Sequence, residues 1–362
     1  MKIIEIHNYR DFLALKDVWN DVLQKCDHSV FSTWDWLSIW WKHFGNDKRL
    51  MILLAEEGNK LFGIAPLMYS VHSMFGLRRG KIEFIGTPSS DYNDFIITEK
   101  KEECLRLFIN HINNWPEKWD CIDLKEIPEN AEYMPLLAKF SQKLTIIHKC
   151  PYIPLPKSYD LFLKSLSHKL RKNLRVSLRK LEKDDPKVNF TDYSDVQSSN
   201  KGMQIFFDLH QKRWISKGCS GVYAEEKARN FHLDIAKSFS QKGWLGLYSL
   251  ELSGRPVSAH YGFKYDQKFY SYLSGFDPAF YRYGIGKLLI AHVISQCIHQ
   301  GLTEFDFLRG AEDYKNRWNT KERFNRQAIL IRNGFLAKSE NWLYNEYWHQ
   351  GNRLKYFLKI QQ

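Results

Sequence analysis

The first 150 residues alternate short apolar runs, typical of strands, with longer segments in which apolar residues recur every three or four positions. This pattern predicts strands at 2–7, 50–56, 61–70, 81–86, 94–98, 120–126 and 144–149. It predicts helices at 11–25, 33–44, 100–114 and 130–142. The turn sequence at 57–59 joins the second and third of these strands, so a hairpin is expected there.

Three prolines, Pro151, Pro154 and Pro156, follow this half of the chain. Proline fixes φ and lacks a backbone N–H, so we expect this segment to be neither helix nor central strand. The sequence therefore predicts a domain boundary here. The expected organisation is an N-terminal unit at 1–150, a C-terminal unit at 151–335 and a terminal helix at 336–362.

The second half opens with a predicted helix at 159–183. Its leucines recur at steps of three and four and form one apolar stripe: Leu163, Leu166, Leu170, Leu174, Leu178 and Leu181. The pattern then predicts strands at 187–193, 244–252, 256–265, 268–276, 303–308 and 327–332. Further helices are predicted at 195–217, 285–300 and 338–359, with a short helical turn at 311–318.

The two halves resemble each other in the order of these elements. In each half, strands joined by tight turns are followed by a helix and then by a strand that contains an aspartate, at 121–124 and 304–307. A duplicated unit explains this order most simply. The predicted fold class is therefore α+β, with two tandem units that each contain a mixed, mostly antiparallel sheet flanked by helices.

The positive charge is concentrated in one segment. The chain has 53 Lys and Arg against 41 Asp and Glu, a net charge of +12. Residues 164–183 hold eight of the cations and one acid, Glu182, and so contribute 8 − 1 = +7. Three explanations stay open: an anionic partner such as a tRNA, an acidic membrane surface that carries a lipid-linked glycan, or a solvated helix held by its leucine stripe.

Several classes of protein are excluded by composition. The hydrophobic content of 44% rules out a disordered chain. The six cysteines are far apart and form no CxxC pair, so neither a disulfide scaffold nor a metal site is expected. No signal peptide pattern is visible, and the longest apolar runs, such as 61–69, are shorter than the 18 to 20 or so residues that span a bilayer. We expect a soluble, cytoplasmic protein, with peripheral membrane contact open.

A glycine-containing turn precedes the predicted helix at 285–300. Its sequence is Tyr283-Gly284-Ile285-Gly286-Lys287. Glycines at the start of a helix allow a phosphate to approach free backbone N–H groups, where the helix dipole also favours negative charge. A meander, this turn, a helix and a strand follow one another in that order.

That order resembles the GNAT acyltransferase superfamily. The sequences at 272–278 (YLSGFDP), 305–310 (FDFLRG) and 313–318 (DYKNRW), with the basic start at 168–175, resemble the BioF2-like or CelD-type acetyltransferases. These are relatives of the FemABX aminoacyltransferases, whose members carry two GNAT-like units in one chain. The resemblance spans residues 159–318. One departure is Tyr281, where the wider superfamily usually has Gln or Arg three residues before the first glycine of the turn.

The resemblance implies an acyl-CoA donor, most simply acetyl-CoA, whose pyrophosphate rests on residues 283–287. It further implies that a backbone N–H near Leu273 or Ser274 polarises the thioester carbonyl, and that Tyr314 protonates the departing thiolate. The alternative role for Tyr314 is packing alone.

Acyl transfer also needs a base for the acceptor. The resemblance places the strand that carries His260 beside the acceptor, so His260 is the candidate base; a hydrogen-bonded structural histidine is the alternative. Asp306 lies between two phenylalanines and is expected on the opposite sheet face from both. A carboxylate in a strand lowers stability unless it is paired or has a functional role. We therefore expect Asp306 to orient the acceptor or a base, or else to pair with Arg309. Arg309 and Lys315 are candidates for holding a phosphate or carboxylate, with solvated side chains as the alternative.

These features favour an acyl-CoA-dependent N- or O-acyltransferase that acts on a sugar, a polysaccharide precursor or another cell-envelope acceptor. The N-terminal unit, which lacks such a glycine turn, is then expected to be a degenerate copy. The first alternative is a FemABX-type enzyme that uses aminoacyl-tRNA. A further alternative is a binding module on the same fold without catalytic activity.

Overall fold

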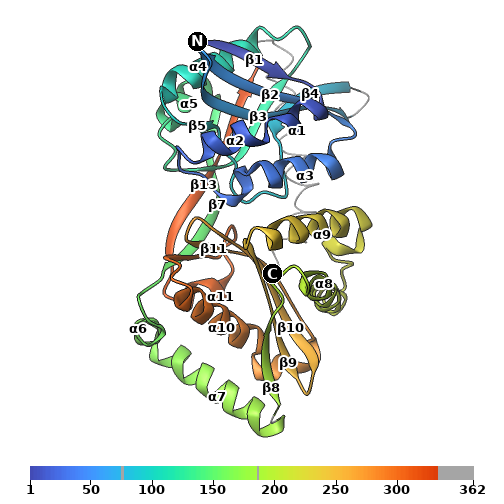
Figure 1. The fold of residues 1–362 in the computed structure, drawn as a ribbon, viewed down its shortest axis with the longest axis vertical. Coiled ribbons are helices and arrows are strands. Elements are labelled where there is room, and N and C mark those ends of the chain that lie inside the picture. Colours follow the sequence, from blue (N-terminus) through green and yellow to red (C-terminus); the bar gives the residue numbers. More distant parts are fainter. Residues whose placement is uncertain (75–76, 186, 333–362) are drawn as a thin grey trace. The chain divides into compact units, whose positions relative to one another are not determined.

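The computed structural model describes residues 1–74, 77–185 and 187–332, which form two compact units (Figure 1). Of the described residues, the first unit contains 1–149 and 323–332, and the second contains 150–322. The expected units were 1–150 and 151–335, so the last described strand returns to the first unit instead of completing the second. The predicted helix at 338–359 lies outside the described residues.

The sheet of the first unit has the strand order β1-β2-β3-β4-β6-β13, and β5 pairs with β3. All these pairs are antiparallel except β4 with β6. Its strands are β1 (Lys2–Ile6), β2 (Lys48–Glu57), β3 (Lys60–Met74), β4 (Leu77–Phe84), β5 (Ile96–Ile97), β6 (Cys121–Pro128) and β13 (Lys321–Ile331). Its helices are α1 (Tyr9–Ala14), α2 (Lys16–Leu23), α3 (Trp34–Phe44), α4 (Lys101–Asn113) and α5 (Met134–Phe140), with a 3-10 turn, η1 (Val30–Ser32).

The sheet of the second unit has the order β7-β12-β11-β10-β9-β8, in which only β11 and β12 are parallel. Its strands are β7 (Lys143–Pro154), which begins in the first unit, β8 (Val188–Asp192), β9 (Leu245–Leu252), β10 (Arg255–Tyr265), β11 (Lys268–Phe276) and β12 (Glu304–Asp306). Its helices are α6 (Tyr159–Ser165), α7 (His168–Asp184), α8 (Ser199–Ile215), α9 (Glu226–Gln241), α10 (Ile285–His299) and α11 (Asp313–Asn316), with 3-10 turns η2 (Val222–Ala224) and η3 (Pro278–Tyr283).

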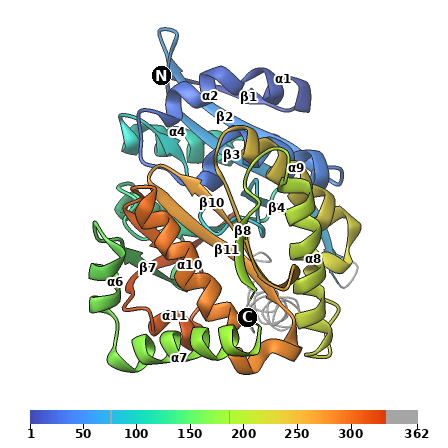
Figure 2. The ribbon, with the colours of Figure 1, turned by 60° about the horizontal axis from the view of Figure 1, so that its bottom comes forward.

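Helices cover both faces of the second sheet. Figure 2 shows α8 and α9 on one side of β10 and β11 and α10 on the other. The apolar face of α10 and the leucine stripe of α7 share one buried core with Phe269 of β11 and Phe305 of β12. The leucines of α7 therefore have the packing role that their spacing predicts.

Two local predictions were wrong. The proline-rich segment at 150–156 was expected to be neither helix nor central strand, but β7 runs as far as Pro154 and pairs with β12. A proline carbonyl still accepts hydrogen bonds, and the Phe307 N–H donates one to Pro151 O at 2.9 Å. The predicted helix at 159–183 is two helices, because Leu166 is extended and Ser167 accepts a bond from the Leu170 N–H and so starts α7.

Helix α9 was not predicted at all. Its buried residues include Phe231, Ile235 and Phe239, whose four-residue spacing was an available signal. Polar residues occupy much of the rest of α9 and weaken the pattern.

The two units share one topology, as the sequence predicted. In each, a strand and its helices lead into a three-stranded meander, then a helix, then a strand parallel to the last meander strand. The corresponding elements are β2-β3-β4-α4-β6 and β9-β10-β11-α10-β12. The fold is the predicted α+β arrangement of two sheet-and-helix units.

Candidate active site

The parallel strands of the second unit separate soon after they meet. β12 pairs with β11 only through Lys268, Phe269 and Tyr270, and no described residue of β12 pairs with β11 beyond Tyr270. At the same place the register of β11 against β10 slips by one residue, between the pairs Tyr261–Leu273 and Phe263–Tyr270. An extra residue in β11 kinks the strand and redirects its backbone groups. Leu273 and Ser274, the predicted carbonyl-polarising positions, lie just after this bulge.

The predicted glycine turn begins α10. Gly284 is the N-cap of α10, with φ 64° and ψ 36° in the left-handed region that glycine adopts at little cost. A Cβ at Gly284 would lie 2.5 Å from Cε of Lys287, whereas a Cβ at Gly286 would have no atom within 4 Å. Open space at Gly286, directly over the first turn of α10, leaves backbone N–H groups accessible to a ligand.

The basic helix α7 lies against this turn, a relationship that the sequence did not reveal. Ser177 Oγ is 3.4 Å from the position of a Cβ on Gly284. The Lys180 ammonium lies 5.4 Å from the ring centre of Tyr283, and the Tyr283 hydroxyl donates to Asp184 at 2.6 Å. One flank of α7 therefore belongs to the turn that starts α10.

A further cation lies within the first turn of α10. Burial lowers the pKa of Lys287, and the nearby charge of Arg317 lowers it further. The positive charge near the glycine turn therefore comes from α7, from α10 and from the segment that follows α11. Mutual repulsion of this kind is relieved when an anion binds.

The segment after β12 is tightly folded. Asp306 is fully buried, and one carboxylate oxygen accepts a bond from the Leu308 N–H at 2.7 Å. Leu308 itself has φ 58°, in the left-handed region. Lys315 is 4% exposed; its ammonium donates to Arg309 O at 2.9 Å and pairs with Glu312 at 2.9 Å. Lys315 is thus not the solvated cation that one interpretation of the sequence offered.

His260 is buried among aromatic rings. It is 2% exposed, and its ring lies 5.9 Å from that of Phe269 and 6.3 Å from that of Phe305. Nε2 is 3.0 Å from Ser271 Oγ, and Nδ1 has no hydrogen-bond partner. Burial lowers the pKa of His260 to about 4, so the ring is neutral at pH 7. Any proton exchange with a substrate would therefore run through Ser271.

His260 and Asp306 do not lie together. Phe305 and Phe307 belong to the core under α10, where His260 also contacts Phe305. Since successive side chains of a strand point to opposite faces, Asp306 projects to the other face of the sheet. The two residues therefore do not form a pair.

Tyr314 lies close to the point where β11 and β12 part. Its ring meets the Phe307 ring edge to face at 6.3 Å, and burial raises its pKa. The charges of Lys315, Glu312 and Arg213 all act on it.

Arg213 is a candidate site residue that the sequence reasoning missed. It lies on α8, donates to Ser274 O at 3.4 Å and stacks its guanidinium 4.8 Å from the ring centre of Phe276. Its Nε is buried without a partner. Arg213 therefore connects α8 to the end of β11, near Tyr314. A lone arginine in a long helix carries no local signal of such a role.

The equivalent positions of the first unit differ. Lys100 occupies the place of Gly284 before α4, and the first turn of α4 carries Glu102 and Glu103. Lys100 pairs with Glu57 at 2.6 Å. Acidic side chains at a helix N-terminus repel a phosphate, so this turn is unsuited to an anionic donor.

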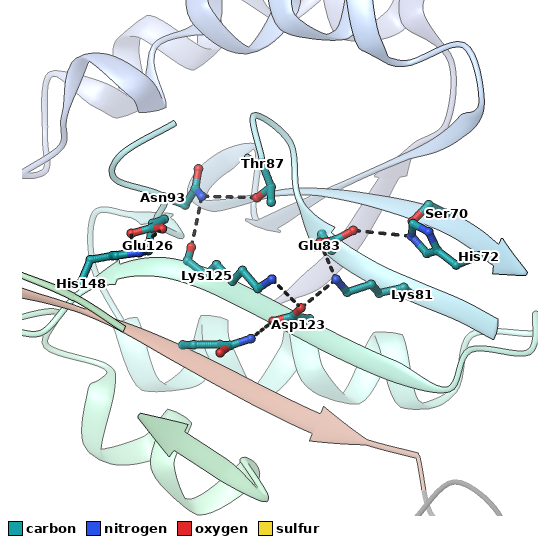
Figure 3. Close-up of polar contacts among 11 residues, drawn as sticks. Ser70, His72, Lys81, Glu83, Thr87, Asn93, Asp123, Lys125, Glu126 and His148 are labelled. Carbon is teal, nitrogen blue, oxygen red and sulfur yellow. Dashed lines mark hydrogen bonds and ion pairs between the residues drawn. The ribbon is translucent and has the colours of Figure 1, made fainter. Parts of the chain in front are cut away.

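Buried charges occupy the β4 and β6 face of the first unit (Figure 3). Lys81 is 1% exposed and pairs with Glu83 and Asp123, each at 2.7 Å. The Gln327 amide donates to Asp123, and Lys125 lies 3.4 Å from it. The positive charge of Lys81 holds the pKa of Asp123 well below its usual value. These residues satisfy one another and so have a structural role.

Part of the second unit matches a known protein family. Residues 168–316 match the family described as "Acetyltransferase (GNAT) domain". The chain contains a GNAT acyltransferase domain. It is an enzyme of the transferase class. A comparison with curated protein sequences finds no match.

Solved structures share the fold along most of the chain. FemX is 12% identical, with a TM-score of 0.64, over 91% of this chain and 98% of that one. L-PGS from Bacillus licheniformis is also 12% identical, with a TM-score of 0.55, over 89% and 94%. A tandem GNAT protein from the clavulanic acid biosynthesis pathway is 8% identical, with a TM-score of 0.52, over 92% and 99%. The GNAT domain thus sits in a two-unit fold related to that of FemX.

The described residues contain neither a membrane-spanning helix nor a group of side chains that would suit a metal ion. None of their helices is long and apolar enough to cross a membrane. None of their His, Cys, Asp and Glu side chains gather in a group of three or more that would suit a metal ion.

Proposed function

We propose that the chain is an acyl-CoA-dependent N- or O-acyltransferase that transfers an acetyl or other small acyl group to a sugar, a polysaccharide precursor or another cell-envelope acceptor. The observation that carries this proposal is the glycine turn at Gly284 and Gly286, which starts α10 and is joined to the bulged strand β11 by η3. The match of residues 168–316 to the acetyltransferase (GNAT) family supports it.

The donor's pyrophosphate binds, in this proposal, at residues 283–287. Backbone N–H groups at the start of α10 meet its oxygens, and the dipole of α10 favours the negative charge. Lys287 and Lys180 add positive charge on either side of the turn. The thioester then lies along β11, towards Leu273 and Ser274.

Transfer proceeds by attack of an amine or hydroxyl on the thioester carbonyl. The backbone N–H of Leu273 or Ser274 stabilises the oxyanion as it forms. Tyr314 donates its phenolic proton to the departing thiolate, and its raised pKa keeps that proton in place at neutral pH. The acceptor's proton passes through the Ser271 hydroxyl to His260, which acts as the base despite its low pKa.

Charged side chains hold the acceptor. Asp306, which faces away from His260, accepts a bond from the Leu308 N–H and so orients the turn that carries Arg309. Arg309 binds a carboxylate or phosphate of the acceptor, and Lys315 supports this turn through its contacts with Arg309 O and Glu312. Arg213 adds a guanidinium beside Ser274, where its planar donors suit a carboxylate or phosphate. None of the six cysteines is joined in a disulfide, which fits the reducing cytoplasm where acyl-CoA is available.

Thermal unfolding with acetyl-CoA tests the donor. We expect millimolar acetyl-CoA to raise Tm, since a ligand that binds only the folded state stabilises it. Gly286→Val should leave Tm without ligand nearly unchanged, because its Cβ meets open space, but should abolish the shift. No shift in the natural chain, or an equal shift in Gly286→Val, would remove the main support for acyl-CoA.

The second candidate is a FemABX-type enzyme that uses aminoacyl-tRNA. The similarity to FemX over 91% of the chain favours it. Binding of charged tRNA that weakens steeply with salt, without any acetyl-CoA effect, would select this function over the first.

A further inference from the structure

The flank of α7 that faces away from its leucines is strongly basic. Leu170, Leu174 and Leu181 are buried against α10, and the opposite side of the helix carries Lys172, Arg175, Arg179 and Lys183, all exposed. These four residues recur at steps of three and four, so they form one row along the helix. We call this row the outer face of α7. It is distinct from the flank at Ser177 and Lys180 that meets the glycine turn.

Glu182 is the only acidic residue among residues 164–183, so the outer face keeps a net positive charge. None of the eight cations of residues 164–183 forms a salt bridge within the described part of the chain. Within the described residues, Arg171 is the one of these cations that donates hydrogen bonds, to Leu163 O at 3.3 Å and Lys164 O at 2.9 Å, which close the end of α6. Exposed like charges along one helix face repel one another and weaken that helix by themselves. An anionic surface would remove this cost.

Exposed apolar side chains lie among these cations and on α6 and η3, the elements next to α7. Val176, on the outer face itself, is 53% exposed, and Leu161 on α6 is 52% exposed. Tyr281, in η3, which contacts α7, is 75% exposed. Phosphates of a nucleic acid offer nothing to Val176, whereas the boundary of a lipid bilayer accepts aliphatic side chains and tyrosine beside lysine and arginine.

We propose that the outer face of α7 docks the enzyme on the surface of an anionic lipid membrane. Lysine and arginine meet the lipid phosphates, and Val176 enters the region below the headgroups. Each basic residue near such a surface strengthens binding about fivefold, so four in a row give reversible, salt-sensitive attachment. The glycine turn, on another flank of α7, remains accessible to the donor.

Sedimentation of the full chain with lipid vesicles tests this inference. We expect binding to phosphatidylcholine vesicles that contain about 30% phosphatidylglycerol, and none to phosphatidylcholine alone. Lys172→Gln/Arg179→Gln should lower binding more than tenfold, whereas the matched pair Lys201→Gln/Lys237→Gln, on α8 and α9, should not. Val176→Ser should lower binding further without a change in net charge. Far-UV circular dichroism and Tm establish that each variant is folded.

Several results would overturn this proposal. It is overturned if anionic vesicles do not bind the protein, or if both double variants bind equally. It is also overturned if poly(U) RNA binds more tightly than vesicles and Val176→Ser affects neither, because the surface would then serve nucleic acid. None of these outcomes depends on the acyl donor.

Discussion

Lys100 and Gly284 adopt the same left-handed backbone conformation at the same position of the two units. Their φ and ψ angles are 52° and 41° for Lys100, and 64° and 36° for Gly284, and each is the N-cap of the helix that follows its meander. The repeated topology thus requires the left-handed conformation at this position in both units. Only the second unit has glycine there, which leaves room for a ligand.

The first prediction exploits this pair. Gly284→Lys should destabilise the protein by about 1 kcal/mol, the cost of a left-handed non-glycine residue, and should abolish the acetyl-CoA effect on Tm. Lys100→Gly should relieve the same strain in the first unit and leave the acetyl-CoA effect intact. The measurement is thermal unfolding with and without acetyl-CoA. An acetyl-CoA effect lost in Lys100→Gly would show that the first unit takes part in donor binding.

The second prediction concerns Tyr314. Tyr314→Phe keeps the ring that packs against Phe307 but removes the proton that we assign to the thiolate. We expect kcat to fall about 100-fold, the usual range for loss of a general acid, with KM for acetyl-CoA unchanged. Steady-state kinetics with an accepted amine or sugar checks this. Unchanged kcat would leave Tyr314 a packing residue.

The third prediction concerns the buried ion pairs of the first unit. Lys81→Met leaves Glu83 and Asp123 without their shared cation and should lower the free energy of unfolding by about 3–5 kcal/mol. This loss of stability should shrink at low pH, where Asp123, no longer held ionised by Lys81, takes up a proton. Lys125→Met, which removes a partly exposed cation 3.4 Å from Asp123, should cost much less. Urea unfolding of the two variants at pH 7 and pH 5 measures the difference. Equal costs would contradict the structural role of Lys81.

The fourth prediction is a pH dependence set by Asp94. Burial raises the pKa of Asp94 to about 7, and the hydrogen bond from Tyr133 opposes this only in part. The folded-state pKa of Asp94 lies above its unfolded value of about 4. The contribution of protonated Asp94 to the stability of the folded protein is therefore complete below pH 4 and is lost as pH rises through 7. Asp94→Asn should therefore stabilise the protein increasingly between pH 5 and pH 8, whereas Asn at the exposed Asp21 should not. Thermal unfolding across this range would refute the prediction if both variants changed alike.

Much of the fold was predictable because it depends on local periodicity. The meander strands, the helix after the glycine turn and the leucine stripe of α7 all follow from residues close together in the sequence. The repeat was visible for the same reason, since each unit repeats one order of elements. The strand at Pro151 was not predictable, because the pairing that stabilises it comes from β12, some 150 residues later.

The features of the candidate site also divide into those set by local sequence and those set by tertiary packing. The sequence by itself determined the glycine turn, the strand that ends in Asp306 and the concentration of charge in one helix, because each depends on the types and spacing of neighbouring residues. Only the tertiary structure decided that α7 lies against that turn, that Arg213 reaches Ser274 and that His260 and Asp306 face opposite ways. These relationships join residues that are distant in sequence. They are set by how sheet faces and helices pack, and no single segment of the chain contains that information.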